Sequence, residues 1–146
     1  MRRAPILVVI AIVVTAIATH AAMMLTYSET RITAQGTIKT VGVEAYWDAG
    51  CTEEVTEIDW GTLEPGSQTD TTFYVNNQGN MPVTLSLDTE AWSPSEAQTY
   101  MSLDWDYDGS PVNPDTAIPV RMTLTVSADI TGITAFSFQL VITAQG

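Results

Sequence analysis

Residues 73–87 read FYVNNQGNMPVTLSL, and this stretch decides the fold class. Positions 73 and 75 are apolar on either side of Tyr74, and positions 83, 85 and 87 are apolar with a threonine and a serine between them. Such alternation is typical of strands that turn one face toward a core. Between the two runs, Asn76–Asn80 offers residues that tolerate left-handed backbone conformations, which predicts a hairpin.

Similar runs, rich in β-branched and aromatic residues, continue on both sides of this stretch and are separated by Gly, Pro, Asn and Asp. The predicted strands are Thr37–Trp47, Val55–Trp60, Thr69–Asn76, Pro82–Thr89, Tyr100–Tyr107, Ala117–Ser127 and Thr134–Thr143. Their number and spacing are typical of an immunoglobulin-like domain. The expected fold class is therefore all-β: a single Ig-like antiparallel β-sandwich of about seven strands, preceded by one N-terminal hydrophobic helix.

Two connections carry recognisable turn residues. Leu63–Gly66 places proline before glycine, which predicts a tight turn because proline fixes φ and glycine is free to adopt positive φ. Ser93–Glu96 has the form of a helix-capping box with proline at the first helical position, and it predicts a single helical turn that joins two sheets.

The N-terminal segment predicts export. Ala4–Leu25 contains no charged residue and follows Arg2 and Arg3. A helix over these residues reaches about 33 Å, enough to cross a bilayer core of roughly 30 Å, so membrane contact is expected through residues 4–26. The arginines should stay in the cytoplasm, which puts everything after Glu29 outside the cell.

The fate of this segment is left open between three alternatives. It is an uncleaved anchor, a signal peptide cut near the small residues of Ala16–Ala18, or a pilin-like precursor cut near Arg3, where Pro5 is unfavourable. The protein is accordingly expected at the cell surface, membrane-anchored or secreted. The predicted organisation is a signal or anchor segment over residues 1–28, an extended linker or donor strand over 29–36, and the sandwich domain over 37–146.

The net charge of the chain indicates which kinds of molecule it can bind. From Glu29 onward the chain has 17 acidic and 3 basic residues, a net charge of −14. Such a surface repels a phosphate backbone, so no nucleic-acid partner is expected. A cation or a basic partner surface fits better.

Few residues are suited to catalysis. His20, inside the apolar segment, is the only histidine, so no catalytic triad can form. One histidine and one cysteine are too few for a zinc site. We therefore predict that the protein is not an enzyme and has no required cofactor. Cys51, which has no cysteine partner, is predicted to be a small buried residue, with an intermolecular disulfide as the alternative.

The best candidate for a ligand site is a group of aspartates that matches the start of a calcium loop: Asp104, Asp106, Asp108 and, at the twelfth position, Asp115. Calcium is thus the one cofactor that the sequence leaves possible. The competing interpretation is an ordinary strand whose aspartates alternate outward, followed by a hairpin turn at Asp108-Gly109. The four tryptophans are interpreted as core residues, with a carbohydrate platform as the alternative.

A pentapeptide is repeated: Ile32–Gly36 recurs as Ile142–Gly146. One interpretation is that the repeat arose by chance, because both copies have the residue composition of strands. Alternatively, the two copies occupy equivalent edge positions, so that the N-terminal copy of one subunit can add as a donor strand to the sheet of the next.

The run Gly61–Gly66, followed by residues 73–87, resembles an L-x-P-G…V-x-N-x-G-N-x-P-V pattern of secreted archaeal Ig-like surface proteins. More distantly it resembles the TasA/camelysin group, which includes archaeal bundling-pilus subunits. This resemblance covers roughly residues 36–146 and implies a filament built by donor-strand exchange. The chain departs from the group in its anchor-length apolar segment and in its lack of metal-ligand histidines, so protease activity is not carried over.

Together these features predict a non-enzymatic structural or interaction protein of the cell surface, a homo-oligomer or pilus-like filament subunit that assembles by strand addition. The alternative is a monomeric, membrane-tethered module that binds a cation, a carbohydrate or a protein.

Overall fold

The computed structural model describes residues 31–146, and the predicted hydrophobic helix and anchor of residues 1–28 lie outside the described residues. The described elements are β1 (Ile32–Val41), β2 (Glu44–Tyr46), β3 (Glu57–Leu63), β4 (Gln68–Asn77), β5 (Thr84–Ser93), α2 (Ala97–Tyr100), β6 (Met101–Trp105), β7 (Thr116–Val126) and β8 (Ala135–Gln145). In this part of the chain no helix is long and apolar enough to cross a membrane.

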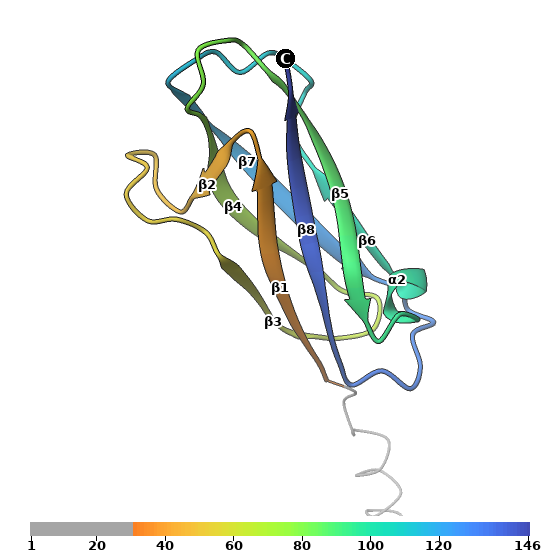
Figure 1. The fold of residues 1–146 in the computed structure, drawn as a ribbon. Coiled ribbons are helices and arrows are strands. Elements are labelled where there is room, and N and C mark those ends of the chain that lie inside the picture. Colours follow the sequence, from red (N-terminus) through yellow and green to blue (C-terminus); the bar gives the residue numbers. More distant parts are fainter. Residues whose placement is uncertain (1–30) are drawn as a thin grey trace, which may run out of the picture. The chain divides into compact units, whose positions relative to one another are not determined.

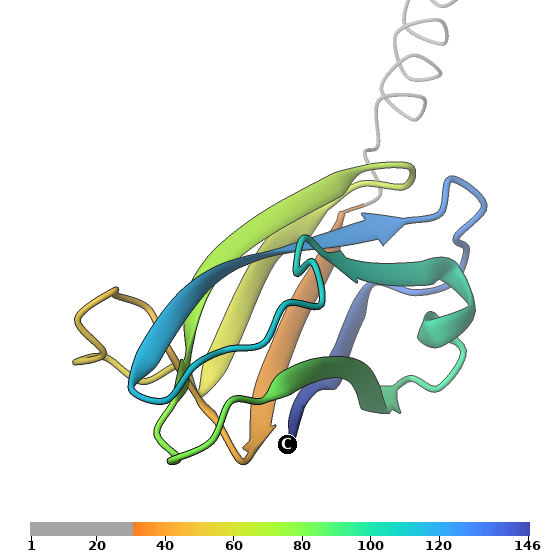
Figure 2. The same cartoon turned by 90° about the horizontal axis from the view of Figure 1, so that it is seen from above.

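The strands form two four-stranded sheets (Figures 1 and 2). One has the order β3-β1-β8-β5, and the other β2-β4-β7-β6. The all-β prediction is confirmed, but the pairing is not purely antiparallel, because β1 runs parallel to β8. The predicted strand Thr37–Trp47 is in fact two strands, because Gly42 adopts a φ of +79° and turns the chain from one sheet to the other.

The core lies between the sheets, where alternate residues point inward. In β4, Phe73 and Val75 are fully buried, as their alternation predicts, and Met122 and Leu124 of the neighbouring β7 join them. Phe138 is buried from β8 in the other sheet. Full burial of a side chain of this kind stabilises the fold by about 1.5–3 kcal/mol, so these residues contribute to the core that joins the two sheets.

The hairpin predicted at Asn76–Asn80 is wrong. The strands on either side, β4 and β5, lie in different sheets, and the segment carries the chain from one sheet to the other. Instead of a left-handed turn, it is organised by the buried side chain of Asn77. The Asn77 Nδ2 group donates to the carbonyl oxygens of Met81 (2.7 Å) and Val112 (2.9 Å), and Oδ1 accepts from the N–H of Gly79 (3.0 Å).

The other two predicted connections are present. At the Leu63–Gly66 turn, the N–H of Ser67 donates to the carbonyl oxygen of Glu64 (3.1 Å), and Gly66 has a φ of +77°. A single helical turn joins β5 of one sheet to β6 of the other, as predicted, but this turn is α2 at Ala97–Tyr100 and starts after the predicted Ser93–Glu96. Its N-cap is Glu96, which makes no side-chain cap, so the capping-box detail is wrong.

The first strand begins earlier than predicted. The boundary expected at residue 37 falls inside β1, which starts at Ile32 and lies between β3 and β8 of its own chain. The two copies of the pentapeptide therefore do not occupy edge positions, since β1 and β8 are the two central strands of their sheet. The two copies are also out of register, because Thr40, and not Ile32, lies opposite Ile142.

Candidate functional site

The first two aspartates of the predicted calcium loop lie on or directly after β6. Asp104 is exposed and lies opposite Thr123 of β7. Asp106 is exposed too, and its Oδ1 accepts the backbone N–H of Arg121 (2.8 Å), while its own N–H donates to the carbonyl oxygen of Arg121 (3.2 Å). This carboxylate thus extends the ladder between β6 and β7.

The other two aspartates belong to separate parts of the connection between β6 and β7. Asp108 Oδ1 accepts the N–H of Ser110 (2.9 Å), and this bond holds the pKa of Asp108 below its usual value. Asp115 has a φ of 54°, and its N–H donates to the carbonyl oxygen of Asn77 (2.8 Å). Within residues 31–146 no three carboxylate, histidine or cysteine side chains are placed to share one metal ion, and calcium binding stays a prediction.

A short loop around Asp48 holds the single cysteine. Asp48 accepts the hydroxyl of Thr52 (2.7 Å) and the backbone N–H groups of Thr52 (3.0 Å) and Glu53 (2.9 Å). These bonds, the Thr52 hydroxyl first, lower the pKa of Asp48. Cys51 lies inside this loop with a φ of 55° and a partly exposed side chain, so the prediction of a buried core residue is wrong.

Of the four tryptophans Trp60 is buried in the core, and Trp47 and Trp92 are partly buried and packed against it. Trp92 stacks on Phe138 with ring centroids 4.4 Å apart, and Trp60 stacks on the same ring at 6.1 Å. Trp47 meets Phe73 edge-on at 6.4 Å. A common platform of four exposed rings is therefore not formed, and Trp105, described below, has a different environment.

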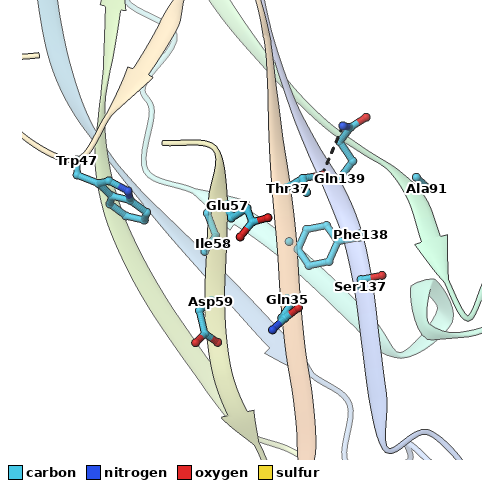
Figure 3. A pocket seen from close by; sticks show the side chains of 11 residues that line it. Gln35, Thr37, Trp47, Glu57, Ile58, Asp59, Ala91, Ser137, Phe138 and Gln139 are labelled. Carbon is cyan, nitrogen blue, oxygen red and sulfur yellow. Dashed lines mark hydrogen bonds between the residues drawn. The ribbon is translucent and has the colours of Figure 1, made fainter. Parts of the chain in front are cut away.

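A pocket of about 640 Å³ opens at the sheet that contains β1 (Figure 3). Polar residues of its lining come from three neighbouring strands and alternate with the buried Gly36 and Phe138, so they lie on the outer face of the sheet. The strand register places them in two rows across the sheet: Asp59–Gln35–Ser137 and Glu57–Thr37–Gln139.

Two hydrogen bonds engage side chains of these rows. Gln139 Nε2 donates to Thr37 Oγ1 (3.4 Å), and Asp59 Oδ1 accepts the backbone N–H of Gly61 (2.8 Å). Gln35 and Ser137 are exposed, so a ligand can reach their polar atoms. Amides, hydroxyls and carboxylates in this arrangement can hydrogen-bond a polar ligand, and the pocket lining includes no histidine or cysteine that would act as base or nucleophile near neutral pH.

The sequence analysis did not find these rows. Each contributing strand shows polar residues at alternate positions, which predicts a solvent-facing side but not which strands are neighbours. The rows exist because β1 pairs with β3 and β8, neither of which is next to it in the sequence.

A second hollow, of about 560 Å³, lies between β5 and β6, where each sheet has an edge strand. Trp105 and Tyr107 line it with ring centroids 5.1 Å apart, together with Leu87 and Leu103. The exposed Asp104 and Asp108 also line this groove. The sequence analysis singled out the aspartates of this groove for calcium and Trp105 as a core or carbohydrate-platform residue, but it did not bring them together in one groove.

The sequence matches no protein-family model and no curated protein.

Proposed function

We propose that this chain is a non-enzymatic structural or interaction protein of the cell surface, built on one Ig-like domain, and that its copies assemble into a filament by exchanging β1. The observation that carries the proposal is the position of β1. The first strand of the described domain lies between β3 and β8, neither of which comes directly after it in the chain.

The inner side of β1 contributes to the core. Ile32 and Ala34 are fully buried, and Gly36 is buried beside Trp60. A copy without its own β1 in place would expose this apolar slot together with two rows of backbone hydrogen-bonding groups. The β1 strand of a second copy has the same sequence and satisfies both, which is the basis of donor-strand complementation.

The chain leaves β1 through a short bend that can act as a hinge. Gly42 has a φ of +79°, and only residues 42 and 43 separate β1 from β2 in the other sheet. A short connection between two sheets is a place where a terminal strand can extend into a neighbouring subunit with a change at few dihedral angles.

The cell-surface location rests on the charge pattern of the sequence. Arg2 and Arg3 precede an uncharged apolar segment, and all acidic residues follow it. On the positive-inside rule this arrangement exports the β-domain. Protease added to intact cells should accordingly digest the domain, and protection of the C-terminus would contradict the location.

The exchange of β1 between subunits can be tested with an engineered disulfide between two residues that lie opposite each other on neighbouring strands. Gln35 of β1 lies opposite Ser137 of β8, and both are exposed. In a Cys51→Ser background, the pair Gln35→Cys and Ser137→Cys should oxidise between subunits in material extracted from cells, and give a ladder of covalent oligomers on a non-reducing gel. Asp70→Cys with Thr123→Cys, which joins β4 to β7, is the matched control and should give only monomers.

The result that contradicts strand exchange is equally clear. If the Gln35/Ser137 pair closes only within single chains, and the extracted protein is monodisperse at high concentration, β1 stays in its own domain. The function that would then remain is the alternative: a membrane-tethered monomeric binding module for a cation, a carbohydrate or a protein. The polar pocket over Gln35 and Ser137 favours a ligand with several hydrogen-bonding groups for such a module.

A further inference from the structure

The four edge strands of the two sheets differ in how well they are protected against pairing with another chain. The free side of β2 is covered by the loop that follows it, through bonds from the N–H of Trp47 to the carbonyl of Glu53 (2.7 Å) and from the N–H of Val55 to the carbonyl of Ala45 (2.9 Å). The β3 edge has a register shift where Trp60 is an extra residue opposite β1. Covering loops and bulges are the usual protection of sheet edges.

The β5 edge is mostly occupied. At its start, Val83 and Val112 exchange two backbone hydrogen bonds (3.0 and 2.7 Å), and the N–H of Leu85 donates to the hydroxyl of Tyr107 (3.2 Å). Further along, the N–H of Thr89 donates to the side chain of the preceding Asp88 (2.8 Å). Little of this edge is left for a new strand.

The β6 edge is different. The N–H of Asp106 donates to Arg121, and the N–H of Ser127 donates to Tyr100, so even-numbered residues of β6 are bonded to β7. Because hydrogen-bonded pairs alternate along an antiparallel ladder, the backbone groups of Leu103 and Trp105 point the other way, into the groove beside β5. Among residues 31–146, none of the backbone bonds outside the ladders engages them.

The groove also has two chemically different sides. The inward positions Leu103 and Trp105, with Leu87 of β5, present partly exposed apolar side chains. On the outward side, Asp104 and Asp108 are exposed, and no lysine or arginine lines the groove. In Figures 1 and 2, β5 and β6 lie on the same side of the domain, in different sheets.

We propose that the β6 edge is a docking site for an extended segment of a different protein, in which apolar residues alternate with lysine or arginine. Paired with Leu103 and Trp105 through the backbone, such a segment places its apolar residues against the apolar wall of the groove. Its basic residues then lie beside Asp104 and Asp108. Opposite charges next to each other on neighbouring strands stabilise the pairing, and backbone bonds supply affinity.

A second copy of this chain is a poorer occupant of the edge. Two β6 strands placed edge to edge would bring Asp104 and Asp106 of one copy close to the same residues of the other, and like charges opposite each other destabilise a strand pair. The site is therefore separate from the exchange of β1, and each of the two proposals can fail without the other.

The test uses the full-length protein in a non-ionic detergent and an end-blocked decapeptide of alternating valine and lysine as the probe. Binding is followed by the tryptophan fluorescence of the protein and by hydrogen exchange of its amides. We expect saturable binding that slows exchange at the amides of Leu103 and Trp105. A peptide of alternating valine and glutamate, with the same period and the opposite charge, should not bind.

Charge reversal on the protein tests the proposed role of the carboxylate. Asp104→Lys should weaken binding by about tenfold, because an attraction between opposite charges on neighbouring strands becomes a repulsion between like charges. Glu64→Lys, which makes the same change of charge in the exposed turn between β3 and β4, should bind within about twofold of wild type, as expected for a surface charge far from the groove.

Three results would overturn the proposal. Binding without slower exchange at Leu103 and Trp105 would mean that the peptide is held by the general negative charge of the domain. Equal weakening by Asp104→Lys and Glu64→Lys would lead to the same conclusion. Slower exchange at Leu103 and Trp105 that rises with protein concentration in the absence of peptide would identify a second copy as the occupant.

Discussion

Gly36 of β1 lies so close to Trp60 of β3 that a Cβ atom at position 36 would be 3.0 Å from the indole Nε1. The indole is 5% exposed and stacked on Phe138, so it has little room to move away. The glycine is therefore required by close approach inside the sheet and not by a turn.

We predict that Gly36→Ala lowers the free energy of unfolding by about 1–3 kcal/mol, the usual cost of overpacking a filled core. Thermal or denaturant unfolding measures it. The neighbouring exposed Thr37→Ala is the control and should change stability little. If Gly36→Ala is as stable as wild type, the contact with Trp60 is not tight in solution.

Asn77 gives a second prediction. It is 1% exposed and bonds to three backbone groups: those of Gly79 and Met81 in the crossing between the sheets and that of Val112 in the connection between β6 and β7. Asn77→Ala would remove the donor to the Met81 carbonyl and the acceptor of the Gly79 N–H, whereas the Val112 carbonyl would keep the N–H of Val83. We expect the substitution to cost about 1–3 kcal/mol of unfolding free energy. The exposed Asn80→Ala, in the same crossing, should have a small effect. Similar denaturation midpoints for the two variants would contradict the role of Asn77.

Asp48 predicts a pH dependence. Its hydrogen bonds hold its pKa below the ordinary value of 3.8, so the ionised form stabilises the folded state. This contribution is present above the unfolded pKa and disappears as the pH falls through the lower, folded pKa. Asp48→Asn should therefore lower the melting temperature near pH 7, and the difference from wild type should shrink as the pH falls below about 4.

The control for that comparison is Asp70→Asn, which removes the same charge from an exposed position on β4. Its difference from wild type should not follow the same pH course. A constant difference between Asp48→Asn and wild type from pH 7 to pH 2 would show that the loop does not depend on the ionised carboxylate.

Calcium gives a further prediction. In the described residues Asp106 is engaged with the N–H of Arg121 and Asp108 with the N–H of Ser110. Bringing both to one cation would break these bonds, so we expect millimolar calcium to leave the melting temperature unchanged relative to a chelator. A rise that Asp106→Ala abolishes would show instead that the loop rearranges into a site, since a ligand stabilises the state that binds it.

The local features of the sequence predicted much of the fold. Alternation at Phe73 and Val75, and around Leu85, identified buried faces, because the side-chain period of a strand is a local property. The turn at Pro65 and Gly66 was equally predictable, because it depends on the φ preferences of its own residues. Composition and charge likewise predicted an all-β domain that is acidic.

The tertiary structure alone decided which strands are neighbours, and the candidate sites depend on that choice. Gln35 meets Asp59 and Ser137 only because β1 enters between two strands that are distant from it in the sequence. Sequence patterns also could not show that the predicted hairpin at Asn76–Asn80 would not form. The side chain of Asn77 bonds to Val112, which is 35 residues away. Turn preference and alternation act within a few residues, whereas strand pairing, a groove between two sheet edges and the environment of a buried amide depend on contacts between distant parts of the chain.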